Sequence, residues 1–91
     1  MAFHIPKSVK IGGLMYKIEW TEVIEHCGET NNKDLTIRLK KDCQKESIEA
    51  TFLHELLHAI NGEKKEEEVE FLAMALYQFI VDNPTVFKNG K

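Results

Sequence analysis

The sequence predicts an α+β domain, in which a small antiparallel sheet of about three strands packs on two antiparallel helices. Three observations lead to this prediction. Short alternating segments rich in β-favouring residues fill residues 8–40, apolar residues then recur at helical spacing, and a short polar segment separates two helical patterns. Strands followed by helices in chain order are typical of α+β domains.

Length and composition point to one globular domain spanning residues 1–91. The chain is 43% hydrophobic and 30% charged, and its net charge of −3 offers no basic footprint for nucleic acid. No apolar run approaches the ~20 residues of a membrane span. The opening MAFHIPKSVK lacks the apolar segment of a signal peptide, so we expect a cytoplasmic protein that binds neither nucleic acid nor membranes. Nothing in the sequence indicates the oligomeric state.

The strands follow from alternation and turn residues. Residues 8–11 form a short strand candidate, and Gly12-Gly13 is a tight hairpin signal before the β-favouring segment 14–21, LMYKIEWT. The polar segment 25–34 is expected to be a loop. Residues 35–39, LTIRL, alternate apolar with polar side chains and predict a half-buried strand.

The first helix is predicted over about residues 45–61. Its apolar stripe recurs at spacings of four, four and three residues, and comprises Ile48, Phe52, Leu56 and Ala59. The pair Asn61-Gly62 predicts the end of this helix.

A second helix is predicted over about residues 64–82, because Pro84 cannot continue it. The side chains that we expect it to bury are Val69, Leu72, Ala73, Leu76 and Ile80.

The stretch FLHELLHAI in the first helix carries three polar residues in an apolar context. His54 and His58 are four residues apart and share one helix face, away from the apolar stripe. This spacing offers two nitrogens to one Zn²⁺, and Glu55 lies beside them, where it can reach a water bound to the metal. The pattern predicts two metal ligands and a general base on one helix.

Two other interpretations compete with a catalytic metal. A buried histidine is commonly a hydrogen-bonded core residue, and this short pattern also arises by chance in helical hairpins. A zinc-stabilised binding or regulatory module could keep the same residues without a usable cleft. Convergence of two imidazoles and a carboxylate within an apolar helix favours a metal site over a chance pattern.

The third ligand is expected among the glutamates of the second helix. Glu67 and Glu68 fall away from the stripe that contains Val69, whereas Glu66 and Glu70 flank it on one side. Helical geometry alone leaves both Glu66 and Glu70 open as the ligand.

The motif HELLH matches that of zincin metallopeptidases, and the later segment EEEVEFLAMAL is similar to the second helix of their glutamate-liganded branch, the gluzincins. From Lys10 to Pro84 the chain resembles short zincin-like proteins of bacterial and bacteriophage genomes. In these proteins a Glu-containing helix follows the HExxH helix and ends near a DNP-type segment, here Asp82-Asn83-Pro84. The resemblance implies one Zn²⁺, hydrolysis of peptide bonds, and an edge strand that binds extended peptide. It also implies that Glu66 is the ligand and that Glu70 orients a ligand histidine.

Together these patterns predict a zinc peptidase that acts on a peptide or protein substrate. His54, His58 and Glu66 hold the zinc, Glu55 takes a proton from the attacking water, and residues 35–39 supply the edge for substrate.

Two further residues, Tyr77 and His26, are candidate hydrogen-bond donors to a developing oxyanion, although such side chains are more often simply solvated. Cys27 and Cys43 are sixteen residues apart in a chain that shows no secretory signal, so we expect two free thiols. A disulfide and a metal-ligand role are the alternatives, and no CxxC spacing favours either.

Overall fold

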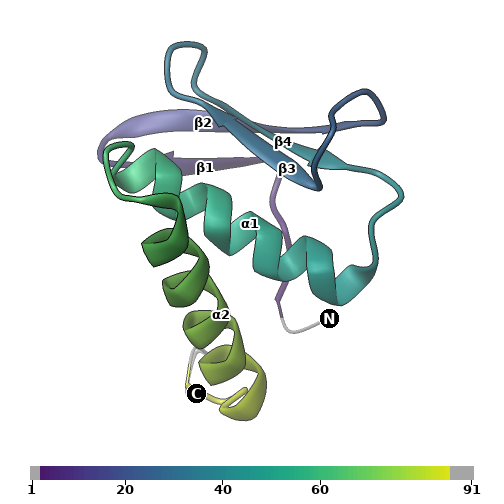
Figure 1. Cartoon of the computed structure of the whole chain (residues 1–91), viewed down its shortest axis with the longest axis vertical. Coiled ribbons are helices and arrows are strands. Elements are labelled where there is room, and N and C mark those ends of the chain that lie inside the picture. The colour runs from purple at the N-terminus through teal and green to yellow at the C-terminus, as the bar shows by residue number, and fades with distance from the viewer. Residues whose placement is uncertain (1–2, 87–91) are drawn as a thin grey trace.

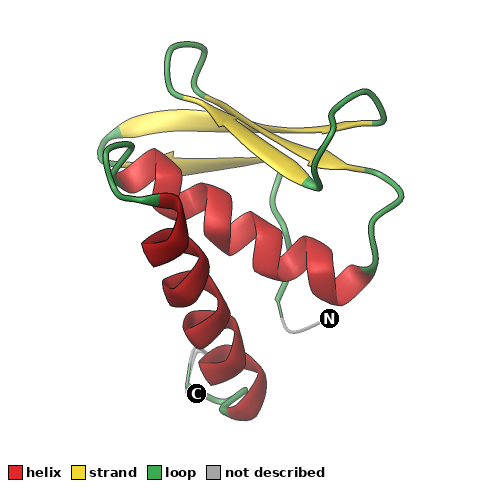
Figure 2. Ribbon diagram, viewed as in Figure 1, coloured by secondary structure: helices red, strands yellow, loops and turns green. Residues whose placement is uncertain are grey.

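A computed structural model describes residues 3–86 of the chain. A four-stranded sheet forms one layer, α1 crosses one face of this sheet, and α2 packs on α1 and diverges away from the sheet (Figures 1 and 2). The α+β class predicted from the sequence is confirmed. The elements are β1 (Ser8–Ile11), β2 (Leu14–Thr21), β3 (Gly28–Asn31), β4 (Thr36–Lys40), α1 (Lys45–Ile60) and α2 (Glu66–Asp82).

The predicted hairpin joins β1 to β2. Gly12 and Gly13 have φ angles of 57° and 84°, the left-handed region that two-residue hairpin turns require at both central positions. Only residues without a Cβ adopt these angles at little cost, which is why the glycine pair locates the turn correctly.

The sheet differs from the prediction in strand number and direction. Its order is β1-β2-β4-β3, and β2 pairs with β4 in parallel, so the sheet is mixed rather than antiparallel throughout. The fourth strand is β3, in the segment that we expected to be a loop. Its sequence, GETN, contains one β-favouring residue, so β3 forms because it pairs with β4 rather than from its own propensity.

This strand order also changes the predicted edge. The strand predicted at residues 35–39 is β4, which lies between β2 and β3, so the expectation that it offers a free edge is wrong. The free edge beside α1 belongs to β3. Strand order depends on pairing between distant segments, which alternation within one segment does not specify.

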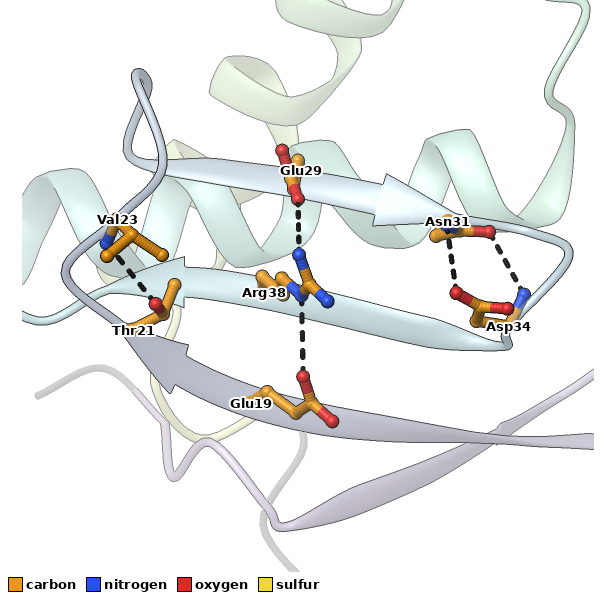
Figure 3. Close-up of polar contacts among 7 residues, drawn as sticks. All are labelled: Glu19, Thr21, Val23, Glu29, Asn31, Asp34 and Arg38. Atoms are coloured by element: carbon orange, nitrogen blue, oxygen red, sulfur yellow. Dashed lines mark hydrogen bonds and ion pairs between the residues drawn. The ribbon is translucent and has the colours of Figure 1, made fainter.

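Register separates the two faces of the sheet. Glu19, Arg38 and Glu29 are cross-strand neighbours on the outer face, where the guanidinium of Arg38 lies 3.4 Å from Glu19 and 3.3 Å from Glu29 (Figure 3). On the opposite face Ile37 and Leu39 are completely buried. The inner face of β3 and β4 is therefore the one that α1 covers.

The apolar stripe of α1 faces this sheet. Ile48 and Phe52 are 4% exposed and join Ile37 and Leu39 in the core, while Leu56 packs at its margin. The helix ends at Ile60, within one residue of the prediction.

α2 begins two residues later than predicted, at Glu66, after Lys65 in an extended conformation. Val69 and Ala73 are buried as expected, but Leu72 and Leu76 are 41% and 38% exposed. This part of the prediction is wrong, because α2 packs on α1 along a narrow stripe. Among the described residues, neither helix has the length and apolar composition to cross a membrane.

Candidate metal centre

The two motif histidines lie on the face of α1 that is turned towards the start of α2. Their side chains are 12% and 22% exposed, and the Nε2 atoms of His54 and His58 are 3.1 Å apart. Residues four apart on a helix stack on one face, so α1 itself fixes this convergence.

Glu66 brings a third donor to the same point. The turn after α1 folds the chain back, and Glu66 is the first residue of α2. One carboxylate oxygen lies 2.9 Å from Nε2 of His54 and the other lies 2.9 Å from Nε2 of His58. These three side chains could hold a metal ion.

The hydrogen bonds of His54 fit such an ion. Its Nδ1 lies 3.0 Å from Oε1 of Glu70, and an ionised carboxylate can only accept, so the proton of a neutral imidazole belongs on Nδ1. The Nε2 atom then presents a lone pair to an oxygen of Glu66, which is repulsive unless a proton or a cation lies between them. A carboxylate that fixes the tautomer in this way is typical of histidines that ligate metals.

The spacing of the donors leads to the same conclusion. Ligand atoms 2.0–2.1 Å from a tetrahedral ion lie about 3.3 Å from one another. The two Nε2 atoms and the nearer oxygens of Glu66 are 2.9–3.1 Å apart. Two imidazole nitrogens and a carboxylate are also a donor set that suits Zn²⁺, so the residues present fit that metal.

Glu55 lies next to the three donors but is more deeply buried, with 6% of its surface exposed. Burial raises the pKa of the Glu55 carboxyl above its ordinary value, while the hydrogen bond from Thr30 and the neighbouring histidines oppose this rise. The Oγ1 atom of Thr30 donates to Oε1 of Glu55 at 2.6 Å. A carboxyl group with a raised pKa is closer to the proton affinity that a general base needs near neutral pH.

An open cavity of about 740 Å³ gives access to these groups. Its walls are β3 on one side, α1 beneath, and the start of α2 on the other side. The residues that line it include His26, Gly28, Thr30, His54, Glu55 and Glu66. His26 thus lies at the mouth of the cavity, with its side chain 87% exposed, as one of the two candidate oxyanion donors.

The other candidate donor is placed elsewhere. Tyr77 donates a hydrogen bond from its hydroxyl to Oε1 of Glu49 at 2.6 Å, and it does not line the cavity that contains His54. The structure therefore does not bring Tyr77 together with the metal donors. Glu70 and Tyr77 are two helical turns apart, and the axis of α2 carries Tyr77 away from the turn where the donors meet.

The structure also adds two residues that sequence analysis missed, Thr30 and Gly28. Both belong to β3, and both lie opposite inward-facing residues of β4 in the register, Ile37 and Leu39. A strand assignment over residues 28–31 would have found them, but the segment GETN carries no alternation of apolar and polar residues that predicts one.

Cys27 and Cys43 form a disulfide, so the prediction of free thiols is wrong. The bond joins the residue before β3 to the segment before α1, and these segments meet because β3 pairs with β4. Disulfides are rare in the reducing cytoplasm, so this bond argues against the predicted cytoplasmic location.

Comparison of the chain with protein-family models, with curated proteins and with solved structures found no match.

Proposed function

We propose that this protein is a zinc-dependent peptidase of the zincin-like type, in which His54, His58 and Glu66 hold the metal. The observation that carries the proposal is the convergence of two Nε2 atoms and one carboxylate within 2.9–3.1 Å, directly beside the buried Glu55. Zinc in such a site supplies a Lewis acid that polarises a carbonyl and lowers the pKa of a coordinated water.

The remaining chemistry belongs to side chains of this chain. Glu55 accepts a proton from the attacking water on its carboxylate and returns it to the leaving amine nitrogen. Glu70 holds His54 in the tautomer whose Nε2 carries a lone pair. The cavity of about 740 Å³ supports an enzyme over a binding module without a usable cleft.

An extended peptide is the substrate that the cavity wall suits. The backbone carbonyl of Cys27 accepts a hydrogen bond from the backbone N–H of Lys40. In an antiparallel pair, hydrogen-bonded and non-hydrogen-bonded residues alternate along each strand, so the backbone groups of Glu29 and Asn31 also face β4. The backbone groups of Gly28 and Thr30 then face the free edge of β3. A peptide added along this edge would pass over Glu55 and the donor cluster.

Glu55→Gln tests the proposal. The amide keeps the shape of the side chain but cannot take up the proton, so cleavage of an unstructured peptide library should fall by ~10²–10⁴-fold while zinc stays bound. Glu67→Gln, on the exposed side of α2, is the matched control and should cleave like the parent protein.

Three results separate the alternatives. A zinc-loaded parent protein that cleaves nothing points to a binding or regulatory module. A parent protein that does not bind zinc points to a helical hairpin with a chance motif. Equal cleavage by the parent and Glu55→Gln proteins removes Glu55 as the base.

A further inference from the structure

The inner face of β3 contacts α1 at the level of Glu55. Thr30 is paired with the buried Ile37 of β4, and residues on one face of a strand point the same way, so the Thr30 side chain is directed towards α1. Its hydroxyl oxygen lies 2.6 Å from Oε1 of Glu55 and 3.0 Å from the Glu55 backbone carbonyl.

One hydroxyl has one proton, and the two acceptors compete for it. The carboxylate oxygen is closer by 0.4 Å than the carbonyl oxygen, 2.6 Å against 3.0 Å, and hydrogen bonds to an ionised acceptor are the shorter and stronger kind. The proton therefore belongs to the bond with Oε1. This bond fixes Oε1 and leaves Oε2 of Glu55 as the oxygen available to accept a proton in the cavity.

Gly28 makes this contact possible. A Cβ atom at residue 28 would lie 2.5 Å from Cγ2 of Thr51 and 3.1 Å from Cγ of Glu55, both on α1. The absence of a side chain at Gly28 lets β3 approach the helix closely, two residues before Thr30 on the same face of the strand.

We propose that Thr30 is a positioning residue, which orients the Glu55 carboxylate from the same strand whose free edge receives the substrate. The inference rests on the proposed peptidase function. It adds that one residue serves both substrate and base, because the backbone of Thr30 faces the free edge of β3 while its side chain holds Glu55.

The first experiment compares kinetics of zinc-loaded Thr30→Val, Thr30→Ser and parent proteins. Valine keeps the β-branched shape and removes the hydroxyl, so kcat should fall by about 10- to 100-fold with little change in KM. Serine keeps the hydroxyl and should restore most of kcat. Thr36→Val, on the outer face of β4, is the matched control and should leave kcat unchanged.

The second experiment does not depend on activity. Thr30→Val should lower the Tm of the parent protein more than it lowers the Tm in a Glu55→Ala background, because that background lacks the carboxylate acceptor and keeps only the weaker bond to the backbone carbonyl of residue 55. Equal Tm shifts in both backgrounds would overturn the contact.

The remaining outcomes distinguish the two proposals. An active parent protein whose kcat is unaffected by Thr30→Val, or not restored by Thr30→Ser, overturns the positioning role and leaves the peptidase intact. An inactive zinc-loaded parent protein overturns the peptidase proposal, and unequal Tm shifts would then make the Thr30–Glu55 contact a structural one only.

Discussion

Among single residues, Tyr77 joins α2 to a carboxylate that is almost fully buried in α1. Its hydroxyl donates to Glu49, which is 2% exposed. This hydrogen bond, with smaller contributions from burial and from the charges of Glu49 and Glu46, raises the pKa of Tyr77 from 10.0 to about 12. The protonated phenol is the form that the fold favours, so its stabilising effect is complete below pH 10 and is lost as the pH rises through 12.

Tyr77→Phe should therefore lower the free energy of unfolding by about 1.5–3 kcal/mol at neutral pH, through loss of one hydrogen bond to a buried carboxylate. Denaturant titration measures this change. In a difference titration of tyrosinate absorbance, parent minus Tyr77→Phe, the missing phenol should ionise near pH 12. An unchanged unfolding free energy, together with ionisation at the ordinary value, would show that the contact with Glu49 is absent in solution.

At the scale of elements, the close approach of β3 to α1 should make residue 28 intolerant of a side chain. Gly28→Ala places a methyl group against Thr51 and Glu55, and overpacking of this kind costs about 1–3 kcal/mol. Gly62→Ala is the matched control, since its nearest side-chain neighbour is the exposed amide of Asn32 at 3.2 Å, and its effect should stay within about 0.5 kcal/mol. Equal losses of stability in the two variants would mean that β3 does not lie against α1.

The disulfide is the covalent link between the start of β3 and the segment before α1. Cys27 and Cys43 are separated by 16 residues, and closing a loop of this size stabilises a fold by about 3 kcal/mol. Replacing both cysteines with serine should reduce the unfolding free energy by that amount, and a dithiol reductant should reduce the stability of the parent protein equally. A thiol assay that finds two free thiols in oxidised protein would contradict the bond.

Local sequence patterns predicted the elements better than they predicted their assembly. Gly12-Gly13 located a turn because the positive φ angles of this turn depend only on the two residues that adopt them. The spacing from Ile48 to Phe52 located a helix face because helical periodicity depends only on residues within one or two turns. The strand β3 was missed because pairing with β4, rather than the sequence GETN, makes it a strand.

The same distinction holds at the candidate site. The histidines of HELLH converge through helix geometry alone. The position of the stripe around Val69 narrowed the choice of third ligand to two acids, Glu66 and Glu70. Thr30 could not be found in this way, since it reaches Glu55 only through the register of β3 against β4.

For the whole molecule, the candidate metal centre lies where three parts of the fold meet. α1 supplies His54 and His58, the turn after α1 returns the chain so that α2 supplies Glu66, and β3 forms the wall opposite (Figure 1). A metal ion bound here would join the two helices, so its removal should lower the Tm of the folded protein. The account therefore depends most on whether these donors bind zinc.

Equilibrium titration of chelator-treated protein with Zn²⁺ is the measurement that tests this claim most directly. The parent protein should bind one zinc per chain, Glu66→Ala should lose tight binding, and Glu70→Ala should bind about 10- to 100-fold more weakly, because it only orients His54. Glu67→Ala, which is exposed and makes no contact with the histidines in the described structure, should bind like the parent. A parent protein that binds no zinc, or a Glu66→Ala variant that binds it as tightly as the parent, would contradict the account.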